Sequence, residues 1–410
     1  MIQLDHKQQC CGCGACVQRC PKQCISMQED IEGFLYPSVD DSACIDCGMC
    51  EKVCPVIHRD DKRVPINCYA ATNPDETIRK ESSSGGIFTM LAEKVLDQGG
   101  VVFGAAWNEK WQVVHKYTDN KGGLSAFRGS KYVQSIIGNS YKQAEEFLKD
   151  GRFVLFTGTP CQIAGLKKFL GKDYENLLAV DFICHGVPSP KVFRWYLQEE
   201  IDQFAAQKRY DKPNKCSSVP HIPKEDIILP DGVQIRKISF RDKRKGWKTF
   251  SLALSVFEEI DCRNNRLETI SSTLHENSFL KGFLNDYYLR PICEKCPAKQ
   301  FKSGADLTIA DYWGYQGNII EDDDTGISAV LLLTVKGEQA FESIGCLSCE
   351  VPYNDILRIN AAAEQSVSAP YRAYFFKQKN MSFNQVITKL TSRRFVDKLV
   401  RKFWLITHRE

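Results

Sequence analysis

Two runs of four cysteines, each followed by proline, constrain this chain more than any other feature. The first run precedes Pro21 and consists of Cys10, Cys13, Cys16 and Cys20. The second precedes Pro55 and consists of Cys44, Cys47, Cys50 and Cys54. The repeated spacing C-x2-C-x2-C-x3-C-P is typical of bacterial ferredoxins that hold two [4Fe–4S] clusters. We therefore predict an iron–sulfur module over residues 1–60.

The spacing also predicts which thiolates share a cluster. Three closely spaced cysteines can surround one cube, while the fourth, beyond a three-residue gap, reaches the other cube. One expected set is Cys10, Cys13, Cys16 and Cys54, and the other is Cys44, Cys47, Cys50 and Cys20. A pair of zinc sites is the alternative, but zinc normally uses paired C-x2-C knuckles. Cys11 and Cys24 fall outside the pattern, and we expect them to be packing cysteines.

Composition supports metal-bound cysteines in a cytoplasmic protein. The chain has 19 cysteines in 410 residues, and the two runs with their neighbours account for most of them. Disulfide-rich scaffolds are usually small secreted domains, so a chain of this length favours metal-bound cysteines. No apolar window is long enough for a transmembrane helix. A net charge of +3 does not argue for nucleic acid as a partner.

From about residue 66 the pattern changes to alternating strands and helices. Short apolar runs at 68–71, 101–107, 153–156, 177–183, 307–310 and 329–334 predict buried strands. Helical spacing falls between several of them. The fold class expected is an α+β ferredoxin-like module followed by an α/β domain with a mixed, partly parallel sheet. Residues 370–410 form a basic, amphipathic helical tail, expected to dock on the body, a partner or a membrane surface.

Four further cysteines occupy positions where a ligand would bind. Cys161 and Cys184 each follow a predicted strand, and ligands of open α/β sheets bind beyond the carboxyl ends of strands. Cys293 and Cys296 form a C-x2-C pair before Pro297. Together they supply enough thiolates for a third [4Fe–4S] cluster. The alternative is four unrelated buried cysteines.

A series of short motifs in residues 66–330 resembles the coenzyme F420 hydrogenase/dehydrogenase beta-subunit family. The motifs include Ser82-Ser-Ser-Gly-Gly86, Arg128-Gly-Ser-Lys-Tyr-Val-Gln-Ser135, Gly158-Thr-Pro-Cys-Gln162, Cys184-His-Gly-Val-Pro-Ser-Pro190, Phe240-Arg-Asp-Lys-Arg244 and Asp306-Leu-Thr-Ile-Ala-Asp-Tyr-Trp-Gly314. The resemblance implies an FAD-binding α/β domain with its own cluster. Its flavin-binding N-terminal part would be residues 66–150, and its C-terminal part, with the third cluster, residues 151–350.

The flavin residues implied by the resemblance lie in two of these motifs. Ser84, Gly85 and Gly86 precede a predicted helix, whose N-terminus would attract the pyrophosphate. Taken alone, the serine run predicts a helix cap and nothing more. The other expected contacts are Arg128, Lys131, Tyr132 and Gln134, which otherwise form a solvated strand.

Four other features of the sequence each allow a functional and a structural interpretation. His185 could protonate a substrate, since imidazole titrates near neutral pH, or it could cap a turn. A basic stretch over residues 236–248 could bind an anion, although a solvated hairpin face is the simpler interpretation. Asp311 and Trp313 line the cofactor pocket or end a core strand, and Cys346 and Cys349 are interpreted as structural or incidental.

These features predict an iron–sulfur flavoprotein oxidoreductase. Electrons would pass from a redox donor such as ferredoxin through the clusters to FAD and then to a small organic substrate, because flavin converts single electrons into a hydride. The resemblance makes a substrate from polysaccharide synthesis conceivable. The alternative is a non-catalytic electron-transfer subunit of a larger hydrogenase/dehydrogenase complex, and a zinc-dependent binding protein is a third hypothesis.

Overall fold

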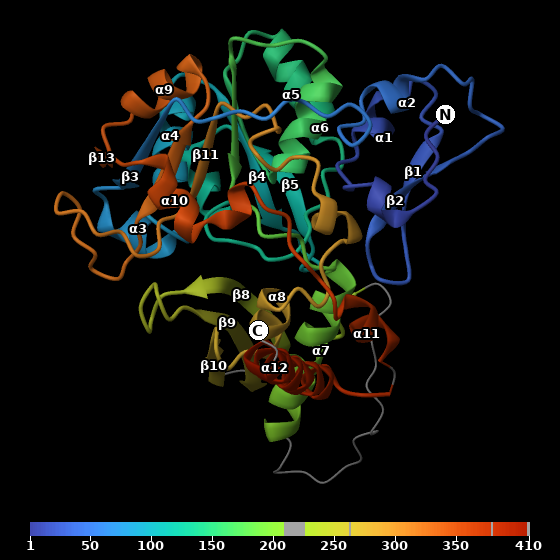
Figure 1. Ribbon diagram of the computed structural model, residues 1–410, viewed down its shortest axis with the longest axis vertical. Coiled ribbons are helices and arrows are strands. Elements are labelled where there is room, and N and C mark those ends of the chain that lie inside the picture. Colours follow the sequence, from blue (N-terminus) through green and yellow to red (C-terminus); the bar gives the residue numbers. More distant parts are fainter. Residues whose placement is uncertain (209–225, 262–263, 379, 408–410) are drawn as a thin grey trace.

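The computed structural model describes residues 1–208, 226–261, 264–378 and 380–407. A small cysteine-rich module at the N-terminus lies beside an eight-stranded sheet, and a three-stranded sheet with its helices lies below (Figure 1). The predicted fold class is confirmed, because a hairpin-and-helix module precedes a mixed, partly parallel sheet.

The N-terminal module consists of one antiparallel hairpin and three very short helices. Its elements are a 3-10 helix at Lys7–Gln9, α1 at Ala15–Arg19, β1 at Ile25–Glu29, β2 at Leu35–Val39 and α2 at Met49–Lys52. Gly14 and Gly48 precede the two α-helices with φ of 72° and 69°. Glycine adopts this left-handed conformation without steric cost, so the cysteines can follow tight turns.

The large sheet has the order β13-β3-β12-β11-β7-β6-β4-β5, and its central strands β11, β7, β6 and β4 are parallel. The six predicted strands are all present, and β5 and β13 are additional edge strands. The bounds are β3 Asn67–Thr72, β4 Val101–Trp107, β5 Val113–Thr118, β6 Val154–Thr157, β7 Leu177–Phe182, β11 Leu307–Asp311, β12 Ser328–Leu332 and β13 Leu347–Glu350.

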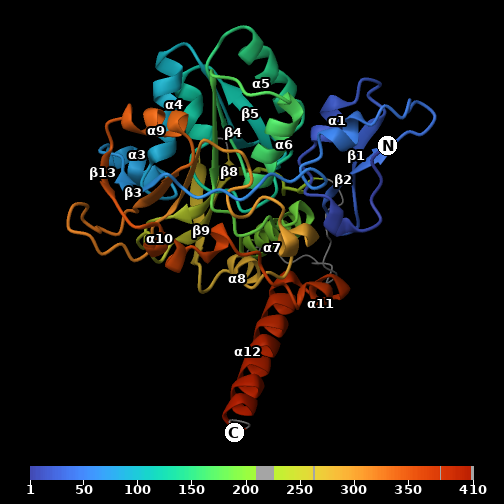
Figure 2. The same cartoon turned by 45° about the horizontal axis from the view of Figure 1, so that its top comes forward.

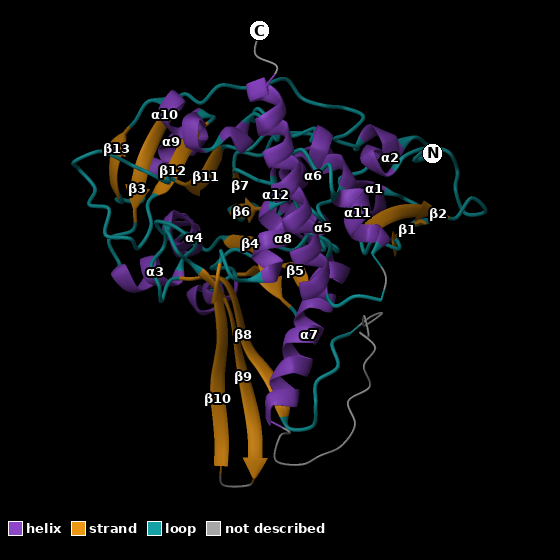
Figure 3. Cartoon of the chain, turned by 60° about the horizontal axis from the view of Figure 1, so that its bottom comes forward, coloured by secondary structure: helices purple, strands orange, loops and turns teal. Residues whose placement is uncertain are grey.

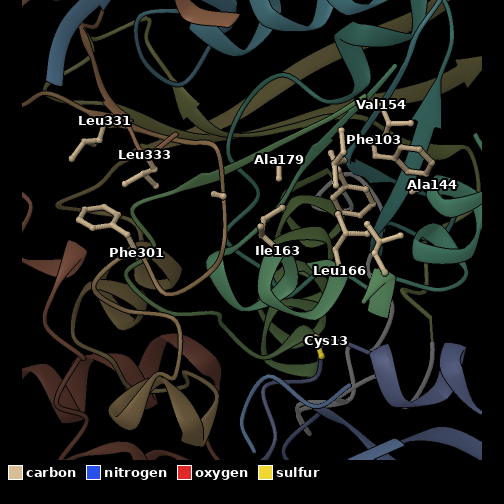
Figure 4. Close-up of a cluster of buried hydrophobic side chains, with 14 of the residues drawn as sticks. Cys13, Phe103, Ala144, Val154, Ile163, Leu166, Ala179, Phe301, Leu331 and Leu333 are labelled. Atoms are coloured by element: carbon tan, nitrogen blue, oxygen red, sulfur yellow. The ribbon is translucent and has the colours of Figure 1, made fainter. Parts of the chain in front are cut away.

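Helices cover both faces of this sheet (Figure 2). Their bounds are α3 Glu76–Glu81, α4 Ile87–Asp97, α5 Ser140–Lys149, α6 Pro160–Leu170, α9 Val335–Glu342 and α10 Tyr353–Ile359, with short 3-10 helices at Lys121–Ala126, Pro291–Lys295 and Ala361–Ala363. Helix α7, Pro190–Lys208, packs instead in the buried cluster of the three-stranded sheet. The module packs on α5 and α6, where Cys13 and Ala15 join the same buried cluster as Ile163 and Leu166 (Figure 4). The module and the body therefore share one hydrophobic core.

The second sheet and the C-terminal helices form a separate buried cluster (Figure 3). Its elements are β8 Val233–Asp242, β9 Ser251–Asp261, β10 Asn264–Thr273, α8 Ser278–Leu284, α11 Arg372–Lys377 and α12 Phe383–Thr407. The start of α12 is anchored, because Phe383, Val386 and Leu390 are buried.

The tail is helical as its spacing predicts. For most of the apolar positions expected to dock, at 395, 399, 400, 403 and 406, the structure describes the helical backbone and not the side chains. Within the described part of the chain, no helix combines the length and apolar character that crossing a membrane requires.

Candidate cluster and flavin sites

The outer end of the N-terminal module holds one group of cysteines around a common cavity. Its wall carries the last cysteine of the first run and three of the second, with Cys24 beside them; the four are Cys20, Cys44, Cys47 and Cys50. The backbone N–H of Ile2 donates to the Cys50 sulfur at 3.3 Å. Such N–H···S bonds stabilise thiolates that ligate a cluster. The fold thus brings together the set that the spacing predicts for one cube.

The remaining four cysteines of the module lie against the body of the protein. Burial, together with the neighbouring thiols of Cys10 and Cys54, raises the pKa of Cys16 to about 12. Cys13 is buried in the core shared with α6. The backbone N–H of Gly12 donates to the Cys10 sulfur at 3.3 Å. We call this second group, which lies on the side of the module that faces the body, the inner group.

Arg290 connects the inner group to the body. Its side chain donates to the carbonyl oxygens of Cys10 and Leu35, both at 2.8 Å, and approaches the Cys10 sulfur at 3.5 Å. It also donates to Gln134, which in turn donates to the Cys11 carbonyl at 2.9 Å. Gln134, a predicted flavin contact, thus lies at the boundary with the module, away from the large cavity described below.

The four body cysteines line one cavity. Cys161 is the second residue of α6, directly after β6, and Cys184 follows β7. Cys293 lies in the 3-10 helix Pro291–Lys295, and Cys296 ends that helix. Burial raises the pKa of Cys293 to about 12. A [4Fe–4S] cube takes one thiolate on each of its four irons, and this set of donors fits such a group.

The four thiols line a cavity and do not converge on the position of a single metal ion. In the residues that the structure describes, no three His, Cys, Asp or Glu side chains are close enough to hold a single metal ion.

Cys11 joins the two regions. Its thiol interacts with both the Cys13 thiol of the module and the Cys161 thiol of the body, and it lines the body cavity. Figure 4 shows Cys13 directly beneath α6. Spacing identified Cys11 only as a packing residue, because no motif indicates which face of a turn meets another domain.

A larger cavity of about 870 Å³ lies on the other side of the loop that follows β7. Residues 181–187, including Cys184, line both this cavity and the cysteine cavity. The volume falls within the range of roughly 300–1,000 Å³ that small-molecule and cofactor sites occupy. Burial raises the pKa of Asp181, in the wall between the two cavities, to about 6.

The N-terminus of α4 opens on this cavity. Gly86 caps the helix at a φ of 83°, and no side chain accepts from its first turn. Unpaired N–H groups at a helix start favour an anion, so this end fits the pyrophosphate of FAD. Ser83 and Ser84 line the cavity beside it. Gly85 packs against β3, where a Cβ atom would approach the Ala71 carbonyl oxygen to 2.5 Å. A side chain at this position would therefore clash with the strand.

Three of the other predicted flavin contacts also line the cavity, namely Arg128, Lys131 and Tyr132. Burial lowers the pKa of Lys131 to about 7, and its ammonium donates to three backbone carbonyl oxygens at 3.2–3.5 Å. The Tyr132 ring stacks on Phe283 with 4.7 Å between centroids. The wall is therefore basic on one side and aromatic on another.

A buried histidine that the sequence did not identify also faces the cavity. His115 Nε2 lies 3.0 Å from the Thr157 carbonyl oxygen, and Nδ1 lies 3.0 Å from Ser135 Oγ. Because a carbonyl only accepts, Nε2 carries the proton and Nδ1 accepts from Ser135. Burial lowers the pKa of His115 to about 4, so the ring is neutral near pH 7.

His185 lines both cavities and has a carboxylate partner. Its Nε2 lies 2.6 Å from Asp286 Oδ1, and its ring meets Phe283 edge-on. A carboxylate hydrogen-bonded to one ring nitrogen holds an imidazole in one orientation. Asp286 has no sequence signal of its own, since only the fold brings it beside residue 185.

The basic stretch divides into buried and exposed parts. Arg241 and Lys243 are enclosed, and burial lowers the pKa of Lys243 to about 7. These two residues depart from the solvated face expected for most of the stretch, whose exposed members are Arg236, Lys237, Arg244, Lys245 and Lys248. Trp247 is fully buried and stacks on Trp313 at 4.1 Å. Both Asp311 and Trp313 line the large cavity.

Three family models match the chain. Residues 68–140 match the N-terminal domain and residues 151–347 the C-terminal domain of the coenzyme F420 hydrogenase/dehydrogenase beta subunit. Residues 9–57 match a 4Fe-4S dicluster domain. The motifs and the folded regions agree with these matches.

Similar curated proteins include a coenzyme F420-dependent sulfite reductase from Methanocaldococcus jannaschii, 26% identical over 58% of this chain and 35% of its own length. A ferredoxin from Mycolicibacterium smegmatis is 38% identical over 15% of this chain and 56% of that protein. This chain thus spans between about a third and about half of the relatives it matches.

Among solved structures, a chain of the F420-reducing [NiFe] hydrogenase complex from Methanosarcina barkeri aligns with a TM-score of 0.42 at 16% identity. The alignment covers 76% of this chain and 99% of that one.

Proposed function

Because this chain belongs to the coenzyme F420 hydrogenase/dehydrogenase beta-subunit family and carries a 4Fe-4S dicluster domain in front of it, we propose that it is an iron–sulfur flavoprotein oxidoreductase. It would pass electrons from a ferredoxin-type donor to a small organic substrate. A sugar-related molecule of polysaccharide synthesis is the first substrate class to test.

One observation carries this proposal: the four body cysteines share a wall with both neighbouring regions. On one side, Cys11 of the module, whose thiol also contacts that of Cys13, reaches Cys161. On the other side, the loop over residues 181–187 separates the cysteines from the large cavity by a single layer of chain. Clusters supply one-electron transfer and flavin couples it to two-electron chemistry. The residues thus support an order in which the outer module group, the inner group, the body cysteines and the cavity follow one another.

The residues that would hold these groups have distinct tasks. The body set is Cys161, Cys184, Cys293 and Cys296, and the flavin would lie between the α4 N-terminus and the Arg128–Lys131 wall. His185, oriented by Asp286, is the proposed proton donor to substrate, because its imidazole lines the cavity and has a carboxylate partner. The aromatic wall excludes water from the same space.

The test is anaerobic purification with iron, sulfide and flavin analysis. We expect roughly twelve irons and one FAD per chain, from three cubes and one flavin site. Cys293→Ser should lose about four irons, because one cube lacks a ligand. The matched control is Cys346→Ser, which alters the other C-x2-C pair near β13 and should lose none. About eight irons and no flavin in the unmodified chain would contradict the proposal.

A second candidate is an electron-transfer subunit of a larger complex. It is favoured by the length of the chain, which spans only 35% of the M. jannaschii relative. Gel filtration together with steady-state reduction assays on the isolated chain separates the two. Turnover by the chain alone supports the enzyme, whereas reduction without turnover supports the subunit.

A further inference from the structure

Arg241 is a buried cation in the wall of the large cavity. It lies near the end of β8, and its side chain is 3% exposed. The residue lines the cavity together with Tyr132, Asp311, Phe250 and Trp313. The side chain is therefore almost fully desolvated and lies in the wall of a space large enough for a cofactor or substrate.

Among the residues that the structure describes, only one of its three nitrogens has hydrogen-bond partners. Nη1 donates to Asp311 Oδ2 at 2.7 Å and to the Tyr132 hydroxyl at 3.2 Å. Nε and Nη2 are buried and have no partner in the described part of the chain. A buried polar group without a partner is costly, so such donors ordinarily have an acceptor that the bare chain does not supply.

The free donors lie on one edge of the guanidinium. The guanidinium carbon lies over two aromatic rings, 4.1 Å from the centroid of Phe250 and 5.0 Å from that of Trp313. Nε and Nη2 present parallel N–H groups, an arrangement that matches two oxygens of a carboxylate or phosphate. The two rings pack against the guanidinium and restrict its movement.

We propose that Arg241 is a bidentate anchor for an anionic oxygen group, carboxylate or phosphate, of a molecule held in the large cavity. The proposal deepens the proposed function, on which it rests for the use of that cavity. Asp311 balances the charge of Arg241, and Lys131 adds a further cationic group to the same cavity wall.

Two sources could supply this anion. Lys243 Nζ donates to the Ser84 carbonyl oxygen, and Trp247 Nε1 donates to that of Ser83. The segment after Arg241 therefore runs along the loop at the α4 N-terminus, where a flavin pyrophosphate would lie. The aromatic side, with Tyr132, faces the rest of the cavity, where a substrate would lie. The chemistry of the anchor is the same in both cases.

The experiment compares two arginines of one strand. Arg241→Lys keeps the charge that Asp311 needs but loses the parallel donors, and Arg241→Gln removes the charge. The control is Arg236→Lys, because Arg236 also lies on β8 over a phenylalanine ring, with Phe257 at 4.6 Å, but is exposed and outside the cavity wall. Iron content and circular dichroism establish that each variant is folded.

Two quantities are measured on the anaerobically purified full chain: FAD per chain, and calorimetric affinity for inorganic phosphate and for oxalate. Loss of a charge-assisted bidentate pair should weaken the affected ligand about tenfold to a hundredfold in both Arg241 variants and leave Arg236→Lys unchanged. A fall in FAD content identifies the flavin as the source. Retained FAD with weaker phosphate or oxalate binding identifies the substrate position.

Unchanged FAD content and unchanged phosphate and oxalate affinities in folded Arg241→Lys would overturn the proposal. So would an equal loss in Arg236→Lys, because the effect would then belong to the strand. If the unmodified chain holds no flavin, the proposed function fails, while the titrations with phosphate and oxalate still decide the role of Arg241.

Discussion

The cysteines of the N-terminal module and those of the body reach the same chemistry by different routes. In the module, short runs and left-handed glycines such as Gly14 direct the thiols over a few residues. In the body, Cys161 and Cys184 meet because parallel strands β6 and β7 end at one sheet edge, and the 3-10 helix Pro291–Lys295 brings Cys293 to the same cavity. The module has a core made largely of its ligands, with Cys16, Cys20, Cys50 and Cys54 in one buried cluster. The body has extensive hydrophobic clusters of its own. The positions of the module cysteines therefore depend on the clusters they would bind, whereas the positions of the body cysteines depend on the fold of the body.

Removal of the clusters should separate the two regions most strongly. We expect chelation of iron under anaerobic conditions to unfold the outer part of the module, raising amide exchange over β1 and β2 about a hundredfold or more. Strands β6 and β7 should keep their protection, since their core consists mainly of aliphatic and aromatic side chains that bind no cluster. Hydrogen exchange with mass spectrometry measures both. Equal loss of protection in the two regions would contradict the comparison.

The second-largest expected effect is the loss of one cluster when Cys20, the cysteine of the first run that is predicted to serve the second cube, is replaced. Cys20→Ser should lose about four irons, and the lost cluster should be the one held by Cys44, Cys47 and Cys50. The inner cluster should remain, since Cys20 lies on the outer cavity. Iron analysis with electron paramagnetic resonance of the reduced protein checks this. The control is Cys24→Ser, whose sulfur lies 3.4 Å from that of Cys20 but is outside the predicted sets.

Arg290 tests how firmly the regions are joined. Arg290→Gln removes charge-assisted hydrogen bonds to Cys10 and Leu35 and should lower the free energy of unfolding by about 3 kcal/mol. Urea denaturation should then show the module melting before the body. The reduction potential of the inner cluster should also fall, because a nearby cation stabilises the reduced form. Arg59→Gln, at the exposed end of the module, is the control and should change neither quantity.

The smallest expected effect is on pH dependence. The pKa values of Lys131 and Lys243 are lowered by burial to about 7, so both lysines are charged at pH 6 and largely neutral at pH 8. Flavin affinity should therefore fall about tenfold as pH rises through this range, since the ligand is anionic. The double variant Lys131→Met with Lys243→Met should remove the dependence. Lys121→Met, at an exposed ion pair with Asp97, should leave it intact.

The sequence predicted the main fold because its signals are local. Strands such as 101–107 are continuous apolar runs, and β4 has those bounds in the structure. The edge strands β5 and β13 escaped prediction because their burial is partial and their partners are distant. Spacing alone defined the eight module cysteines, and the order of motifs identified the family.

Only the tertiary structure decided what lies beside each of these groups. Cys11 and Gln134 belong to the boundary between module and body, and Asp286 to His185, because those contacts join residues more than a hundred positions apart. In the sequence Arg241 is one of several basic residues in one stretch. The fold buries it and leaves two of its N–H donors, Nε and Nη2, without a partner in the described part of the chain. Periodicity and spacing report how a segment is shaped, whereas burial and partners depend on which other segments the chain brings against it.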